Sequence, residues 1–212
     1  PLRGPGLGRP RGQHMNAQLA IAWFLTFFPI TISPGPANIL VSSTSAQYGV
    51  RRTLPVVWGI FVVFAVQIAV MAFGIGEILF RYPRLFSVFK LAGAAYLFYL
   101  AWVLFRSSGL KGNGEARLGF RTGALLQFFN FKALTVPLIM YTQFLDPTSA
   151  SRSELIVLTI ALFCLIIGSL LTWVIGGSLL QTLFRSEFGQ RWQGKIFGVL
   201  LAGVAVWILF RS

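Results

Sequence analysis

Hydrophobic positions are grouped in long runs along this chain, and charged positions fall mainly between the runs. No charged residue lies between positions 19 and 41 or between 155 and 184, and the run 54–80 contains only Glu77. A helix needs about 20 predominantly apolar residues to cross a bilayer. The pattern therefore predicts an all-α, polytopic membrane protein.

Six such runs can be separated, and we expect each to form one membrane-spanning helix. They cover residues 17–43, 54–80, 85–105, 120–145, 155–184 and 192–210. The longest connection, residues 106–119, divides the chain into two halves of three helices, 15–110 and 111–212. Residues 1–14 are rich in Gly, Pro and Arg, and we interpret them as a disordered extension or expression remnant that precedes a native start at Met15.

The two halves resemble each other in their last helices. Residues 90–107 read KLAGAAYLFYLAWVLFRS and residues 195–212 read KIFGVLLAGVAVWILFRS, and seven of the eighteen positions match. Two apolar helices of similar composition can match by chance, but the shared Lys, Gly, Trp and terminal FRS favour a true repeat over a chance match. Because each half has three spans, equivalent helices must cross in opposite directions. The match therefore predicts two inverted three-helix repeats, an architecture common in secondary transporters.

Composition and charge agree with a membrane protein and exclude one class of partner. Only 11% of the 212 residues are charged, against roughly 25% in an ordinary soluble domain. A net charge of +13 would suggest nucleic acid in a soluble protein. Here the basic residues lie mostly between apolar runs, nine of them after the first, third and fifth runs and five on the opposite side. We therefore expect the lipid bilayer and no nucleic acid as a partner. The excess of basic residues after the first, third and fifth runs places those loops in the cytoplasm and both termini on the opposite side of the membrane.

The first run is interrupted at its centre by Ser33-Pro34-Gly35-Pro36. The two prolines lack an amide hydrogen and Gly35 permits almost any backbone geometry, so the carbonyls before the break lose their helical partners. A new helix begins inside the membrane near Asn38, and its free amides favour an anionic group such as a carboxylate. An ordinary proline kink is the simpler alternative, but a polar residue at this depth favours a binding site.

The fourth run places Asn130 and Lys132 at a comparable depth. A lysine at mid-membrane costs about 2.5–3.5 kcal/mol on insertion scales and should face a cavity or a partner; the alternative is a lysine that snorkels to the surface. Gln67, Gln127 and Gln143 either line a cavity or bridge helices. The predicted substrate-binding residues are Ser33, Pro34, Gly35, Pro36, Asn38, Gln67, Asn130 and Lys132.

The motifs SPGPANIL at 33–40, NFKA at 130–133, TQFLDP at 142–147 and the 90–107 segment resemble the LysE/RhtB family of bacterial amino-acid exporters. The resemblance covers residues 15–212. It implies a secondary transporter that exports amino acids or related small zwitterionic solutes across the bacterial cytoplasmic (inner) membrane, driven by an ion gradient.

The chain is divergent within this family in two respects. Phe131 stands where many members have proline, so we expect a softened second break. The second and fifth helices lack the acids of many members, which puts family-like coupling through a membrane carboxylate in doubt.

We expect one substrate site that joins the first break to Lys132. Amides at the start of the second half-helix would bind a carboxylate, Lys132 would add a positive charge, and Asn38 and Asn130 would accept hydrogen bonds from an ammonium. A bound carboxylate would favour the protonated lysine, so H+ is the expected coupling ion. No cofactor is expected, and assembly into a homo-oligomer is left open.

Other functions fit the residues less well. An intramembrane enzyme lacks its parts, since the one histidine, His14, lies outside the apolar runs and no paired Asp or Ser-His arrangement is present. A metal-ion exporter would need Cys, His or carboxylate ligands, and the runs contain a lone Cys164, so we expect no metal site. A non-transporting membrane scaffold and a transporter of another small solute or metal ion stay open as alternatives.

Overall fold

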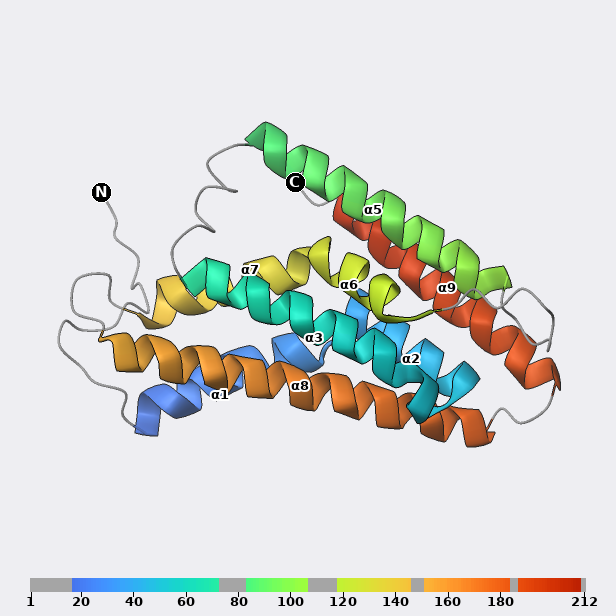
Figure 1. Ribbon diagram of the computed structural model, residues 1–212, viewed down its shortest axis with the longest axis horizontal. Helices are drawn as coiled ribbons and strands as arrows, with labels where there is room; N and C mark the ends of the chain where they lie inside the picture. The colour runs from blue at the N-terminus through green and yellow to red at the C-terminus, as the bar shows by residue number, and fades with distance from the viewer. Residues whose placement is uncertain (1–16, 73–82, 107–117, 146–150, 184–186, 211–212) are drawn as a thin grey trace.

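The computed structural model describes residues 17–72, 83–106, 118–145, 151–183 and 187–210, and every element in these ranges is an α-helix. Figure 1 shows an elongated bundle in which α5 and α9 lie side by side along one edge. Residues 1–14, interpreted above as an extension, lie outside the described ranges. The helices are α1 Ala17–Ile32, α2 Pro36–Tyr48, α3 Val50–Ala72, α5 Pro83–Arg106, α6 Phe120–Phe128, α7 Phe131–Phe144, α8 Arg152–Leu183 and α9 Glu187–Phe210.

The described helices include single and broken candidates for membrane spans. Val50–Ala72 in α3 and Arg152–Leu180 in α8 are each long and apolar enough to cross a bilayer. The pairs α1–α2 and α6–α7 qualify only when each bent pair is taken as one span, and α5 and α9 contain the shorter apolar stretches Leu91–Arg106 and Gly194–Phe210. The described residues are thus all-α and consistent with the predicted polytopic membrane protein, whereas six spans in two inverted repeats stay a prediction.

Both expected interruptions occur, and the second one corrects an expectation. The first run breaks between Ile32 and Pro36, with a bend of 53° between α1 and α2. The second bend, between α6 and α7, is also 53°. The prediction that Phe131 softens the second break is therefore wrong, and side-chain hydrogen bonds described below explain why no proline is needed there.

Apolar side chains form two core clusters, one on each side of the breaks. The first cluster joins α1, α3, α7 and α8, with Phe27, Phe64 and Met140 among its buried members. The larger cluster joins α2, α3, α5, α6, α8 and α9 and includes Leu40 and Leu104. The backbone groups that lose their helical hydrogen bonds at the two breaks thus lie between these two clusters. Protein side chains can satisfy them there, which lipid could not.

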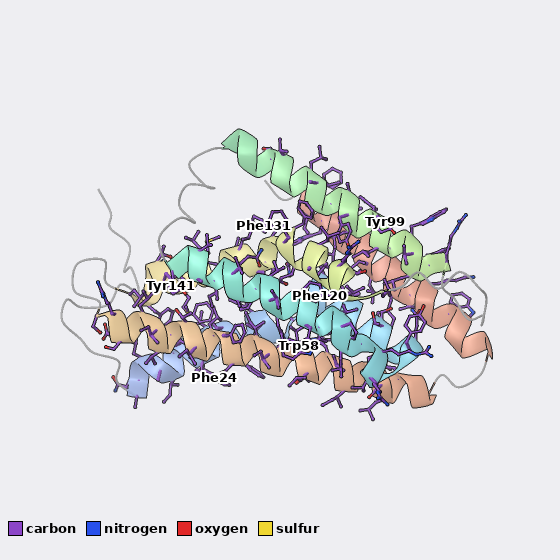
Figure 2. All side chains as sticks on the ribbon, in the orientation of Figure 1. Phe24, Trp58, Tyr99, Phe120, Phe131 and Tyr141 are labelled. Carbon is purple, nitrogen blue, oxygen red and sulfur yellow. The ribbon has the colours of Figure 1, made fainter. Side chains whose placement is uncertain are left out.

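The outer surfaces of the bundle carry large apolar side chains. Figure 2 shows Phe24 of α1, Trp58 of α3 and Tyr99 of α5 among them, and these residues are 46%, 61% and 59% exposed. In contrast, α2 buries ten of its 13 residues, including four consecutive hydroxyl residues at 42–45. The first half of the broken span therefore presents most of its surface to the outside of the bundle, while the second half is enclosed by protein.

Glycines bring helix backbones into direct contact on the side of the breaks where α2 and α6 lie. A Cβ at Gly59 of α3 would lie 2.1 Å from the carbonyl oxygen of Phe120, and one at Gly123 of α6 would lie 2.0 Å from that of Val56. A Cβ at Gly177 of α8 would lie 2.2 Å from a carbonyl oxygen of α2. Small residues allow such close crossings in membranes, so this side of the bundle is packed backbone to backbone.

Candidate functional site

The two prolines of the first break leave two carbonyls without helical donors. In a continuous helix the carbonyls of Ile30 and Ile32 would accept from the residues four positions on, and both of those are prolines. Ser33 donates from its hydroxyl to the Ile30 oxygen at 2.8 Å, and Trp173 of α8 donates from Nε1 to the Ile32 oxygen at 3.0 Å. Each carbonyl orphaned by a proline therefore has a side-chain donor.

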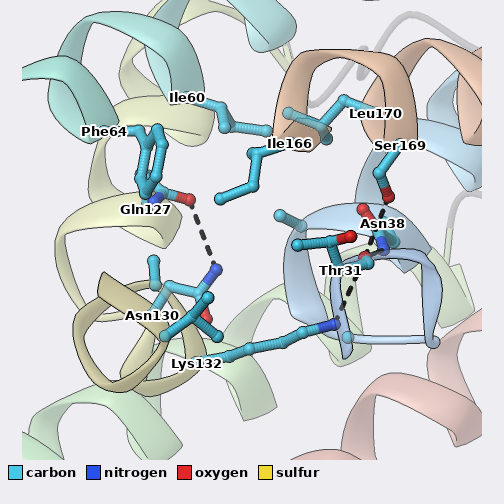
Figure 3. A pocket seen from close by; sticks show the side chains of 14 residues that line it. Thr31, Asn38, Ile60, Phe64, Gln127, Asn130, Lys132, Ile166, Ser169 and Leu170 are labelled. Carbon is cyan, nitrogen blue, oxygen red and sulfur yellow. Dashed lines mark hydrogen bonds between the residues drawn. The ribbon is translucent and has the colours of Figure 1, made fainter. Parts of the chain in front are cut away.

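The other carbonyls of the break, those of Thr31 and Ser33, accept hydrogen bonds from three elements. Asn38 of α2 donates from Nδ2 to both, at 3.1 and 3.0 Å, and Ser169 of α8 donates to the Thr31 oxygen at 2.9 Å. Lys132 of α7 donates from Nζ to the Ser33 carbonyl at 2.9 Å and to the Ser33 hydroxyl at 3.0 Å, and lies 3.5 Å from the Thr31 oxygen. Figure 3 shows the lysine reaching across the cavity to this point. We name its three acceptors the oxygen cluster.

These contacts confirm the predicted position of Lys132 at the first break. All three contacts of Nζ are with acceptors, because the Ser33 hydroxyl gives its own proton to Ile30. An ammonium group has three N–H donors, so these three acceptors match a protonated Lys132. The negative end of the α1 dipole also stabilises a cation at this position. The Asn38 amide, expected to accept from a substrate, uses its nitrogen to donate to the same carbonyls.

The second break is held by a pair of glutamines rather than by proline. Gln67 of α3 donates from Nε2 to the carbonyls of Gln127 and Phe128 at 3.0 and 3.2 Å. Gln127 returns a hydrogen bond from Nε2 to Gln67 Oε1 at 3.0 Å, and Asn130 donates from Nδ2 to Gln127 Oε1 at 3.3 Å. These bonds satisfy carbonyls at the end of α6, so the helix can stop there without a proline.

A cavity lies between the two breaks and contains about 450 Å³ of empty space, counted out to its opening. The part of this space that the centre of a water molecule can reach is only about 50 Å³, enough for a few waters and well below the range of about 300–1,000 Å³ for small-molecule sites. A solute of amino-acid size would therefore have to displace wall side chains to enter. Helices α1, α2, α3, α6, α7 and α8 contribute to its wall, and α5 and α9 do not. The lining residues are Thr31, Gly35, Ala37, Asn38, Ile60, Phe64, Gln127, Asn130, Lys132, Ala133, Val136, Ile166, Ser169 and Leu170.

Four of the eight predicted substrate-binding residues line this cavity: Gly35, Asn38, Asn130 and Lys132. The other four do not. Ser33 anchors the lysine, Pro34 and Pro36 interrupt the helix, and Gln67 bridges α3 to α6, which is the second of the two alternatives given for it. Thr31 and Ser169 were missed, because single hydroxyl residues in apolar helices carry no signal of their own.

One polar atom of the cavity region has no partner among the residues that the structure describes. Asn130 Oδ1 is buried and accepts no hydrogen bond from any described residue. An unsatisfied buried acceptor costs about 1–3 kcal/mol, so a ligand that donates to this oxygen would be stabilised. Among the described lining residues Lys132 alone carries a charge, so the site has one cation, one free acceptor and otherwise apolar or hydrogen-bonded walls.

Two helices broken at mid-span, with a lysine and a mostly apolar cavity between them, are features of membrane carriers that bind their solute at discontinuous helices. The chain belongs to the LysE type translocator family, which matches residues 28–212. The family resemblance inferred from the sequence motifs is thereby confirmed, and the protein is a transporter rather than an enzyme.

Curated relatives match most of the chain. A cysteine/O-acetylserine efflux protein of Klebsiella pneumoniae is 33% identical over 172 residues, which are 77% of this chain and 85% of the relative. Proteins of the same name are 29% identical over 197 residues in Salmonella typhimurium (91% of this chain, 98% of the relative) and 28% identical over 192 residues in Escherichia coli K12 (88% and 96%). No solved structure matches the chain.

Proposed function

We propose that this translocator exports small amino acids or related zwitterionic solutes from the cytoplasm, and that they bind in the cavity between the two helix breaks. The observation that carries the proposal is the Lys132 ammonium at the broken α1, beside a cavity that is also lined by Asn130, whose buried Oδ1 has no described partner. Efflux of cysteine and O-acetylserine is named for the relatives. Both are small amino acids with one carboxylate and one ammonium.

The start of α2 suits the carboxylate of such a substrate. Pro36 occupies the first helical position and has no amide hydrogen. The Ile39 amide already donates a hydrogen bond to the Gly35 carbonyl at 2.9 Å. The amides of Ala37 and Asn38 belong to the first turn, where no intrahelical acceptor precedes them. Both residues line the cavity. The positive end of the α2 dipole and the nearby Lys132 charge then stabilise an anion there.

The remaining walls favour a short, uncharged substrate side chain. Asn130 Oδ1 can accept a hydrogen bond from the substrate ammonium. No described lining residue is acidic, so a second cationic group would lack a partner, and a second carboxylate would be desolvated against apolar wall. The apolar part of the wall consists mainly of Ile60, Phe64, Val136, Ile166 and Leu170.

Six spans in two inverted repeats, residues 15–110 and 111–212, remain our proposal for the membrane architecture. Two broken spans and α3, α5, α8 and α9 would make six. The two helices whose sequences match, α5 and α9, pack against each other and run in opposite directions (Figure 1), and a Cβ at Gly198 of α9 would lie 2.9 Å from the Ala101 carbonyl of α5. Contact between equivalent helices of opposite direction supports a pseudo-two-fold axis between the halves.

The proposed location is the bacterial inner membrane. We place the C-terminal end of α2, and the side of the bundle on which it lies, in the cytoplasm. Arg51, Arg52, Arg106 and Arg121 lie at the helix ends on this side, which the positive-inside bias favours for the cytoplasm. The glycine crossings also lie in this half of the bundle. We further propose H+ as the coupling ion, carried by Lys132 as the one titratable side chain among the described lining residues.

A panel of solutes tests the function on the purified protein. We expect cysteine, O-acetylserine and serine to raise the unfolding temperature in detergent, because a ligand that binds only the folded state stabilises it. Lysine and glutamate should raise the unfolding temperature much less, because the second ammonium of lysine and the second carboxylate of glutamate would have no partner in the cavity wall. If no amino acid on the panel binds, a transporter of another small solute replaces the amino-acid exporter. The mass of the same detergent complex reports whether copies assemble.

A further inference from the structure

The oxygen cluster at the end of α1 has the composition of a site for a small monovalent cation. Its members are neutral oxygens, two carbonyls and one hydroxyl, at the negative end of a helix dipole. Ser169 adds a further hydroxyl oxygen 2.9 Å from the Thr31 carbonyl. Carboxylates, which divalent cations such as Ca²⁺ and Mg²⁺ require, are absent from the described lining residues.

In broken-helix carriers, unwound carbonyls and the C-terminal ends of half-helices coordinate the coupling Na⁺ or H⁺. Here an ammonium of the chain itself occupies that position. We propose that the oxygen cluster is a monovalent-cation site which Lys132 fills as a tethered cation, so that the transporter needs no free Na⁺. The proposal goes beyond amino-acid export, because it concerns the protein without substrate.

Gly35 provides a second, independent observation. Its backbone is extended, with φ −143° and ψ 172°, a conformation that any residue adopts. The backbone therefore does not explain the glycine. A Cβ at this position would lie 3.2 Å from Cδ and 3.4 Å from Nζ of Lys132. Because Gly35 has no side chain, the space through which the Lys132 side chain reaches the oxygen cluster stays open. The glycine of the break is therefore explained by its contact with the lysine.

The proposal predicts that a short side chain at position 132 opens the cluster to Na⁺. In Lys132→Ala the carbonyl and hydroxyl of Ser33 lose the ammonium, and a small cation can take its place. We expect the unfolding temperature of this variant in detergent to rise by about 2–4 °C when choline chloride is exchanged for NaCl at equal ionic strength. KCl should give a smaller rise, and the wild type should unfold at the same temperature in all three salts.

Lys195→Ala is the matched control, because it removes a lysine that is exposed on α9 and does not line the cavity. A Na⁺ response in Lys132→Ala that exceeds the response of this control supports the proposal. An equal response in the two variants, or a Na⁺-specific response of the wild type, overturns it. Should Lys132→Ala fail to fold, Lys132→Ser gives the same readout and adds one more oxygen to the cluster. No substrate is present, so the outcome is independent of the exporter assignment.

Discussion

Direct contact between the backbones of α3 and α6 makes Gly59→Ala a sensitive test of the packing. The new Cβ would lie 2.1 Å from the Phe120 oxygen and 2.8 Å from the Ala124 nitrogen. Carbon and carbonyl oxygen normally stay about 3.3–3.6 Å apart, so α6 would have to move away by roughly 1 Å or more. Overpacking of this kind costs about 1–3 kcal/mol. For a chain of this length the unfolding temperature should fall by about 2–12 °C.

Gly203→Ala makes the same chemical change in a place with free space. A Cβ at Gly203 of α9 meets nothing within 4 Å, and alanine is the better helix former by about 0.8–1.0 kcal/mol. Thermal unfolding of both variants and the wild type in one detergent gives the comparison. A Gly59→Ala protein as stable as Gly203→Ala would show that α3 and α6 do not touch at this crossing.

Three further substitutions separate shape, capping and bridging roles. Gly35→Ala should displace the Lys132 side chain by a few tenths of an ångström and weaken amino-acid binding, while the unfolding temperature changes little because the backbone is extended; unchanged binding would argue against the lysine path. Trp173→Phe should cost about 1–3 kcal/mol of stability by leaving a carbonyl unpaired, and Trp58→Phe, at an exposed position, should cost nothing measurable in the same thermal assay. Gln67→Leu should lower the unfolding temperature yet retain substrate binding, and a loss of binding without a loss of stability would restore the predicted substrate contact.

The first break and its lysine were predictable because elementary constraints act on single residues. Two prolines two positions apart must leave the carbonyls of Ile30 and Ile32 without helical donors. A lysine placed at mid-membrane must find acceptors, and the carbonyls of a broken helix are the acceptors that lipid cannot supply. The sequence thus contains both sides of the contact between Lys132 and Ser33, even though they are 99 positions apart.

The second break and the full cavity wall depended on contacts that no local pattern records. Asn130 and Phe131 contain no helix breaker as strong as proline, and the bend results from a glutamine pair 60 positions apart. Ser169 and Trp173 serve the first break from α8. A hydroxyl or an indole in an apolar helix has no sequence feature that reveals whether it faces lipid or protein. The repeated sequences at 90–107 and 195–212 also gave no sign that the third helix of each half lies outside the cavity.

The central claim is that Lys132 acts in the transport site, and exchange of radiolabelled cysteine by proteoliposomes tests it most directly. Lys132→Met keeps the length of the side chain and removes its charge, and Lys195→Met removes a charge away from the cavity. A substrate carboxylate would take the N–H of Nζ that now makes the long 3.5 Å contact with the Thr31 carbonyl. Such a charge-assisted hydrogen bond is worth about 1.5–3 kcal/mol, so Lys132→Met should lower apparent affinity by about 10- to 100-fold or abolish exchange, with the protein still inserted and folded. Lys195→Met should exchange cysteine at the wild-type rate. Exchange by Lys132→Met at the wild-type rate and affinity would contradict the account.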